Sequence, residues 1–354
     1  MGYYIDKSQK KEYSIPKGGK NMPKHARQKT RILLLADLLH RRTDENHSIT
    51  VDEMRTYLAQ NGIDAERKSS YDDLSALSDY GLDIEKSRGM GGGYRLLSSK
   101  WQLSEIKTLI DAVQSNRFLT ENKSRVLIDK LKTLTSDYNA LALSRHVHIH
   151  NRAKSDNENV LYSLDALHEA IRNGKMVGFY YLDYQPDGTK IRRHGGRRYT
   201  VCPVELTIDD ERYYLVAYGD RGDTLRHYRV DKMEQVTVLE NCPAPAATHA
   251  PEDFARYSLA TFGMFGGKSE TVRLRAENRM ASVLIDRFDR ENCTLIPDGK
   301  DHFTLAVRVV ISPQFFGWLF GLEGKVTILS PESAAKAYED MLKNALYRLQ
   351  NAQK

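Results

Sequence analysis

The chain has 354 residues, of which 40% are hydrophobic and 28% are charged, and these proportions are ordinary for a globular protein. This length favours two to four domains over a single core, and no apolar run approaches the roughly 18 residues that a membrane-spanning helix needs. The net charge is +6, and the three cysteines (Cys202, Cys242 and Cys293) form no CxxC pair. Unpaired cysteines without metal-binding spacing favour a reducing cytoplasm, so we expect a cytoplasmic protein without a membrane partner.

Positive charge is concentrated at the beginning of the sequence. Residues 1–31 hold nine Lys and Arg against only Asp6 and Glu12. The segment lacks the apolar stretch of a secretory signal. We expect residues 1–23 to form a basic flexible tail, which is either simply solvated or an arm that follows a phosphate backbone.

Residues 24–99 show the pattern of three helices followed by a hairpin. Thr50 and Glu53 form a capping box that opens the second helix, and we expect the third helix to turn Tyr71, Leu74 and Leu77 inward. The expected elements are helices at 24–42, from 50 to about 60 and at 65–80, and strands at 82–86 and 94–97. Three helices followed by a glycine-tipped hairpin are the order of a winged helix-turn-helix domain.

A helical connector and a linker are predicted for residues 100–159. Two apolar stripes at helical spacing, over 103–113 and 126–134, predict two helices, and the polar residues 151–159 predict a linker. His146, His148 and His150 alternate just before it. Because nothing nearby supplies a fourth ligand or supporting partners, we favour solvated histidines over a metal site.

Residues 160–242 are predicted to form a helix followed by short strands. Tyr213, Leu215 and Ala217 alternate with Tyr214, Val216 and Tyr218, which is the period-two pattern of a strand with two occupied faces. A second alternating run covers 225–232. Residues 190–199 carry five Lys and Arg and no acid, so they form either a solvated hairpin end or part of a surface for an anionic ligand.

The last third of the chain alternates between strands and helices. We expect a hinge at 243–268 and then an α+β unit at 269–354. The run from Gly263 to Ser269 imitates a phosphate-binding loop, but its first glycine is one residue too close to the Gly-Lys-Ser sequence, so a surface loop is favoured. The expected strands are 270–275, 303–310 and 325–329, and the expected helices are 279–288, 313–320 and 332–349.

Two motifs in residues 213–233 resemble the WYL domain, a family named for its Trp-Tyr-Leu triplet. The triplet is present as Tyr213-Tyr214-Leu215. The signature R-x-[FY]-R-[LIV]-D-R-[IM] follows a short turn and is present as Arg226, Tyr228, Arg229, Val230, Asp231, Lys232 and Met233. The resemblance implies an α+β multidomain protein with a winged helix, a helical connector, a small Sm-like β-barrel and a ferredoxin-like C-terminal extension.

The resemblance also implies a ligand site on the barrel. Aromatic rings and forked cations on neighbouring strands are suited to phosphates and stacked bases, and strand alternation points His227 with Arg229 and away from Arg226. Lys232 replaces an arginine of the family and loses its bidentate fork. The residues expected at the ligand site are Tyr180, Arg198, Tyr214, Arg226, His227, Tyr228, Arg229 and Lys232.

The third helix of the winged-helix region resembles the recognition helix of DeoR-type regulators. Such a helix enters the major groove, where Arg and Lys reach guanine and hydroxyl groups reach phosphates or bases. Two positions depart from that family. Asp72 stands where the family usually has a basic residue, and Ser70 stands where it has an apolar one. The residues expected at DNA are Arg67, Lys68, Ser69, Ser70, Tyr71, Arg88 and Arg95.

These patterns predict a transcription regulator rather than an enzyme. We find no nucleophile elbow, HExxH motif or complete phosphate loop, and we expect no cofactor. The expected partners are double-stranded DNA, a single-stranded nucleic acid or nucleotide ligand, and a second copy of the chain in a homodimer. The alternative is an accessory single-stranded nucleic-acid-binding protein that modulates a partner effector, such as a defence system, without promoter control.

Overall fold

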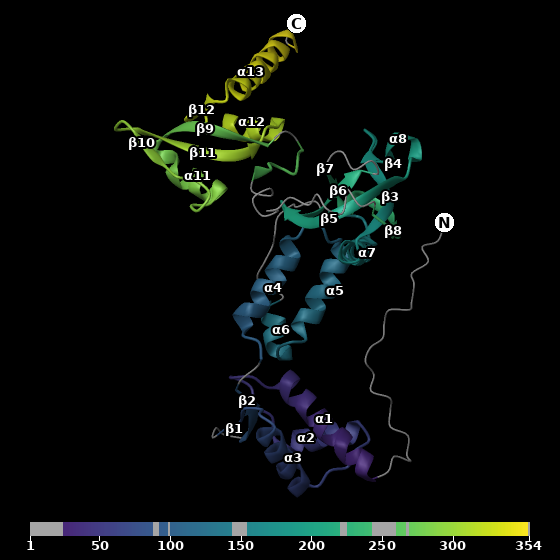
Figure 1. The fold of residues 1–354 in the computed structure, drawn as a ribbon. Coiled ribbons are helices and arrows are strands. Elements are labelled where there is room, and N and C mark those ends of the chain that lie inside the picture. Colours follow the sequence, from purple (N-terminus) through teal and green to yellow (C-terminus); the bar gives the residue numbers. More distant parts are fainter. Residues whose placement is uncertain are drawn as a thin grey trace. The chain divides into compact units, whose positions relative to one another are not determined.

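A computed structural model describes residues 24–87, 92–97, 100–143, 154–219, 225–242, 260–266 and 269–352 (Figure 1). The predicted tail at 1–23, the wing residue Arg88, the histidines at 146–150 and most of the predicted hinge lie outside these residues. The chain divides into two compact units. The first contains α1 to α6, and the second contains the described residues from 154 onward together with the loop 116–120.

The first unit begins with three helices and an antiparallel hairpin, which are α1 (Lys24–Arg42), α2 (Val51–Gln60), α3 (Arg67–Asp79), β1 (Ile84–Ser87) and β2 (Gly93–Leu96). The predicted capping box is present, because the Glu53 amide donates to the Thr50 hydroxyl and the Thr50 amide donates to the Glu53 carboxylate. The prediction that Tyr71 points inward is wrong, since its side chain is 40% exposed. The buried face of α3 instead runs through Ser70, Leu74 and Leu77 at helical spacing, which leaves position 71 on the flank.

A buried ion pair joins the first and third helices. Asp73 on α3 accepts two hydrogen bonds from the Arg31 guanidinium on α1, at 2.5 Å to Nε and 2.9 Å to Nη2. The two side chains are only 11% and 15% exposed. The hydrogen bonding of Arg31 to the Asp73 carboxylate raises the pKa of Arg31. One carboxylate therefore meets one guanidinium, and the pair is neutral.

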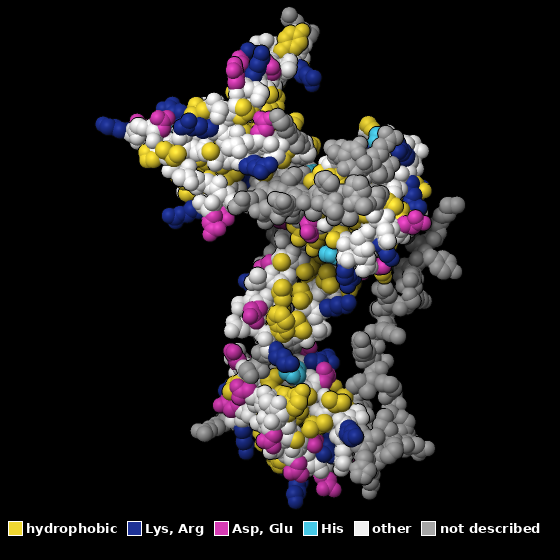
Figure 2. Space-filling view, in the orientation of Figure 1, with side chains coloured by type: hydrophobic (Ala, Val, Ile, Leu, Met, Phe, Trp, Pro, Cys, Tyr) yellow, Lys and Arg dark blue, Asp and Glu magenta, His cyan; other side chains and the backbone are white. Residues whose placement is uncertain are grey.

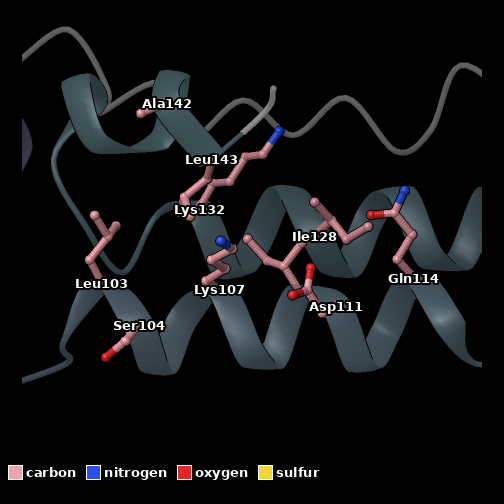
Figure 3. Close-up of a pocket in the computed structure, with 10 residues that line it drawn as sticks. Leu103, Ser104, Lys107, Asp111, Gln114, Ile128, Lys132, Ala142 and Leu143 are labelled. Atoms are coloured by element: carbon pink, nitrogen blue, oxygen red, sulfur yellow. The ribbon is translucent and has the colours of Figure 1, made fainter. Parts of the chain in front are cut away.

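Three further helices complete the first unit, namely α4 (Leu103–Ser115), α5 (Glu121–Lys132) and α6 (Asp137–Leu143), of which α6 was not expected. Their apolar stripes are only partly covered. Ile106 and Ile110 are buried, whereas Leu109 and Leu134 are each 37% exposed and Val126 is 45% exposed. A groove of about 540 Å³ lies between the three helices, with apolar side chains and a few charged ones along it (Figure 3).

The second unit starts with α7 (Val160–Arg172) and a six-stranded antiparallel sheet. The strands pair in the order β4-β3-β5-β6-β7, and β8 also pairs with β3. They are β3 (Lys175–Tyr184), β4 (Lys190–Arg192), β5 (Tyr199–Asp209), β6 (Arg212–Gly219), β7 (Leu225–Arg229) and β8 (Met233–Asn241). The short turn α8 (Arg193–Gly196) separates β4 from β5, and the 3₁₀ turn η2 (Val230–Lys232) separates β7 from β8.

Aromatic rings form a buried cluster among the strands of the six-stranded sheet. Phe179 and Tyr199 are stacked with centroids 5.5 Å apart, and Tyr228 meets Phe179 edge-on at 5.3 Å. Tyr181 joins them, and it is only 8% exposed. Offset and edge-on ring pairs stabilise a core beyond the area they bury.

The C-terminal part has the predicted alternation of strands and helices. It contains β9 (Ser269–Glu277), η3 (Asn278–Met280), α11 (Ala281–Phe288), β10 (Ile296–Asp298), β11 (His302–Val310), α12 (Pro313–Phe320), β12 (Val326–Ser330) and α13 (Glu332–Ala352). The four strands form an antiparallel sheet in the order β10-β11-β9-β12. Apolar side chains from α11, α12 and the sheet form its core. Along the described residues, the structure contains no helix long and apolar enough to cross a membrane.

Candidate anion-binding site

The site is built around a buried carboxylate at the end of β7. Asp231 lies in η2, and its side chain is 7% exposed. It accepts two hydrogen bonds from Arg229, from Nε at 3.1 Å and from Nη2 at 2.7 Å. Arg212, at the start of β6, contacts the same carboxylate at 3.3 Å. Because two guanidinium groups share one carboxylate, the cluster carries one surplus positive charge.

The backbone around this cluster is also fixed. The amide of Arg229 donates to the hydroxyl oxygen of Tyr181 at 3.1 Å. Burial raises the pKa of Tyr181 to about 12, so this hydroxyl stays neutral at physiological pH. The strand end that carries Arg229 is therefore tied to the aromatic core behind it.

A pocket of about 340 Å³ opens in front of the cluster. Its lining contains five Lys or Arg side chains and two Asp side chains, together with Tyr184, Leu182 and Ser155. The charged lining residues are Lys154, Lys190, Arg212, Arg229, Lys232, Asp156 and Asp231. Arginine forks and lysine point charges are the usual ligands of phosphate groups, so the lining is suited to an anion.

The outer cations of the pocket are partly neutralised by acids. Lys190 forms an ion pair with Asp156, and the Tyr184 hydroxyl donates to the other oxygen of that carboxylate at 3.4 Å. Lys232 lies 3.8 Å from Asp183. The Lys190 ammonium also lies 5.3 Å from the centre of the Tyr184 ring, and this ring is 57% exposed, so it offers a face to a base.

The structure brings together only part of the predicted ligand set. Arg229 and Lys232 line the pocket. The strand register places Tyr214 opposite Arg229 and Val216 opposite His227, so Tyr214 and His227 share the Arg229 face of the sheet. Burial raises the pKa of Tyr214 to about 12 and lowers the pKa of His227 to about 4. His227 is therefore neutral near pH 7 and adds no positive charge.

Two predicted ligand residues lie on the face of the sheet opposite to Arg229. Arg226 pairs with Ala217, and Tyr228 pairs with Leu215. Tyr228 is only 6% exposed and packs in the aromatic core, so its assignment as a ring for ligand stacking was wrong. Arg226 is exposed on that face and does not line the pocket that contains Arg229.

The remaining predicted ligand residues have local partners away from the pocket. The Tyr180 ring lies 4.0 Å from the Arg192 guanidinium, which also pairs with Glu234 at 2.8 Å. Arg198 hydrogen-bonds to Thr237 and packs over Gly178, where an added Cβ would lie 2.9 Å from its Nε atom. The lack of a side chain at Gly178 makes room for this guanidinium.

Sequence reasoning missed most of the pocket. Asp231 stood in the quoted signature, but its role in orienting arginines was not foreseen. Lys190 belonged to the basic run at 190–199, and Arg212 directly precedes the aromatic triplet, so both carried a weak signal. Lys154 and Asp156 lay in a segment predicted to be a linker, where charge pattern alone gives no sign of a binding site.

The residues predicted to contact DNA are in part exposed on α3. Arg67 and Lys68 are exposed in its first turn, and Arg67 Nε donates to the Tyr71 hydroxyl at 3.3 Å. Ser69 is half-buried. Ser70 is fully buried and its hydroxyl donates to the Glu66 carbonyl, so its assignment as a DNA contact was wrong.

The hairpin and the surface of α3 are not uniformly basic. Arg95 donates to the Glu85 carboxylate at 2.8 and 2.6 Å and to the Glu45 carbonyl. Residues 32–97 contain eight Lys and Arg against twelve Asp and Glu. Basic side chains (dark blue) and acidic side chains (magenta) are accordingly interspersed over the visible face of α1 to β2, at the foot of Figure 2.

Comparisons with known proteins agree with the motifs. Residues 162–238 match the model of the WYL domain, and residues 268–346 match that of the WCX domain. The chain therefore contains a WYL domain and a WCX domain. In it, the WYL domain comprises most of α7 and the six-stranded sheet, and a WCX domain follows. The search of curated proteins found no match.

Two solved structures show similarity to the chain. Proteasome accessory factor B/C (PafBC) of Arthrobacter aurescens is 17% identical, with 94% of this chain and 51% of that chain covered and a TM-score of 0.27. A CRISPR Cas-related protein is 13% identical, with 85% of this chain and 78% of that chain covered and a TM-score of 0.34. The chain thus spans about half the length of the PafBC chain.

Proposed function

We propose that this protein is a DNA-binding transcription regulator whose WYL domain senses a nucleic-acid or nucleotide ligand, without a catalytic role. The observation that carries the proposal is the pair of guanidinium groups, Arg212 and Arg229, held by the buried Asp231 at the pocket. Their geometry is set before any ligand arrives, which lowers the ordering cost of binding. A phosphate group can accept paired hydrogen bonds from a guanidinium, and its negative charge balances the surplus positive charge of the cluster.

The dimensions of the pocket narrow the ligand class. A volume of about 340 Å³ is at the small end of the range for small-molecule sites. It therefore suits a nucleotide or the phosphorylated end of a strand, with the exposed Tyr184 ring available to stack on a base.

Fluorescence polarisation with a labelled, 5′-phosphorylated oligothymidylate tests the ligand site. Arg229→Ala removes the surplus charge but leaves Asp231 paired with Arg212, so we expect binding to weaken at least about tenfold, the effect of one charge-assisted hydrogen bond. Arg226→Ala is the matched control, because it removes the same charge from the opposite face of the same strand. Equal losses in the two variants would refute the assignment of the pocket.

For the DNA contact, we propose that α1 to β2 act as a winged helix. Arg67, Lys68, Ser69 and Tyr71 on α3 are the proposed contacts, together with Arg88 and Arg95 of the wing. Since residues 32–97 have more acidic than basic side chains, affinity would depend on these few cations and on the basic residues that precede them. A gel shift on the DNA upstream of the gene, compared with a random duplex of equal length, tests this.

A second candidate function is an accessory protein that binds single strands and modulates a partner effector without promoter control. The exposed Asp72 on α3 and the acidic balance of residues 32–97 favour it, because both oppose binding to a duplex. Equal affinity for the upstream region and for random duplex, together with intact binding of the oligothymidylate, would select this candidate over the regulator.

We also propose that the protein is a homodimer. A single recognition helix reads few base pairs, and two-fold symmetric half-sites multiply affinity. The partly exposed stripes on α4 and α5 are one proposed contact surface, and the C-terminal unit at 269–354 is the other. Light scattering of the intact protein at micromolar concentration should give about twice the 40.5 kDa of the chain, and the monomer mass with and without DNA would contradict it.

A further inference from the structure

The described part of the predicted linker is bound to the WYL domain. We call residues 154–157 the strap. The side-chain amide of Asn157 donates to the backbone carbonyls of Asp231 at 3.3 Å and Met233 at 3.0 Å. At the other side of the pocket, Asp156 is paired with Lys190. The strap is thus tied both to the turn that carries Asp231 and to the hairpin that carries Lys190, and its Lys154, Ser155 and Asp156 line the pocket.

The strap is also bonded to the loop that connects α4 and α5. The amide of Ser155 donates to the Arg117 carbonyl at 3.0 Å. The Lys154 ammonium donates to the Asn116 carbonyl at 3.3 Å. The loop, residues 116–120, therefore contacts the wall of the pocket through two backbone carbonyls.

Two anchors hold the loop in the second unit. Phe118 is 1% exposed, and its ring lies 4.7 Å from that of Tyr213, the first residue of the aromatic triplet. Arg117 pairs with Asp210 at 2.6 Å. Asp210 and Glu211 form the β5–β6 turn with φ values of 45° and 60°, and such left-handed conformations are retained only where the surroundings specify them. The loop therefore packs as part of the second unit, although the helices on either side belong to the first.

We propose that the strap reads the occupancy of the pocket and conveys it to α4 and α5. In this scheme Lys154 binds the phosphate beside Arg212 and Arg229, and the bonds of the strap to Asn116 and Arg117 move the loop. An ammonium carries three donors, so one lysine bonds to a carbonyl and to an anion at the same time. The inference rests on the proposed ligand site, but the strap and the loop both lie outside the matched WYL residues 162–238.

Hydrogen–deuterium exchange on the full-length protein, with and without the 5′-phosphorylated oligothymidylate, tests the proposal. We expect the ligand to slow exchange in peptides from the pocket, around 212–233, and to change exchange in peptides spanning 116–125. In Lys154→Ala, binding should be about tenfold weaker. At saturating ligand the pocket peptides should still be protected, while the change at 116–125 should be lost.

Lys300→Ala is the matched control, since it removes the same charge from an exposed turn outside the pocket. If the wild-type protein does not bind the oligonucleotide, the proposed ligand site fails and the strap inference fails with it. If pocket peptides respond to the ligand but peptides at 116–125 do not, or if the two lysine variants behave alike, the inference about the strap is overturned while the ligand site stands.

Discussion

Each of the two compact units contains a buried aspartate that holds arginine, and the two clusters differ in stoichiometry. In the first unit, Asp73 holds Arg31 alone, so the pair is neutral and ties α1 to α3. In the second unit, Asp231 holds both Arg229 and Arg212, so one positive charge is left over at the wall of a pocket. The neutral pair of the first unit is a structural connection, whereas we propose that the surplus charge of the second cluster makes it a preorganised site for an anion.

Replacing the acid in each cluster should have the largest effect. Asp73→Ala and Asp231→Ala each leave buried guanidinium without its counter-charge, and removal of one partner of a buried ion pair costs about 3–5 kcal/mol. Urea unfolding should show a loss of this size in the unit that carries the change. The two variants should differ in function, because only Asp231→Ala should weaken binding of the oligothymidylate. Asp72→Asn, on the exposed face of α3, is the control and should be nearly neutral.

Lowering the pH should destabilise the second unit through His227. Burial lowers the pKa of this ring to about 4, below its ordinary value of about 6.5. The unfolded chain therefore takes up a proton that the folded chain does not, so stability falls as the pH drops from about 6.5 towards 4. Between pH 7 and pH 5 the loss should be about 2 kcal/mol.

Urea unfolding of the wild type, His227→Gln and His168→Gln at the two pH values measures this contribution. The His227 variant should lose about 2 kcal/mol less than the wild type on acidification. His168 is exposed on α7, so its replacement should leave the pH dependence unchanged. A pH dependence that is the same in all three proteins would contradict the neutral buried ring.

Replacing arginine by lysine keeps the positive charge but removes the planar guanidinium, and this change should have different effects in the two arginine clusters. Arg229→Lys keeps the surplus charge but loses the bidentate geometry, so we expect binding of the oligothymidylate to weaken about tenfold, or about 1.4 kcal/mol. Arg31→Lys makes the same change in the neutral pair and should leave that affinity unchanged. An affinity equal to wild type in Arg229→Lys would mean that charge alone, without the fork, holds the ligand.

The smallest effect is expected on α3, where the cations are exposed and not preorganised by a buried acid. Arg67→Ala should lower the slope of log affinity against log salt for duplex DNA by about one unit, the signature of one lost phosphate contact. Arg226→Ala should leave that slope unchanged. A slope that does not respond to Arg67 would remove this residue from the proposed DNA surface.

Much of the secondary structure follows from local pattern. The capping box at Thr50 and Glu53 opens α2 as predicted, and the alternation in 213–218 sets the two faces of β6. The prediction that His227 and Arg229 share a face was correct, because the side-chain period of a strand is two. Sequence pattern failed on Tyr71 and Tyr228, because a tyrosine suits a core and a surface equally well, and only its neighbours in space decide which it joins.

The sequence by itself determined the order of most elements, the WYL signature and the excess of basic residues near the signature, since all of these depend on neighbours along the chain. Only the tertiary structure decided that Asp231 collects Arg212 from another strand, and that the segment at 154–157 joins the pocket to the loop at 116–120. These contacts connect residues far apart in sequence, and they form only when strands and loops pack. A binding site depends on such packing, because charge becomes directional once its carrier is held in place.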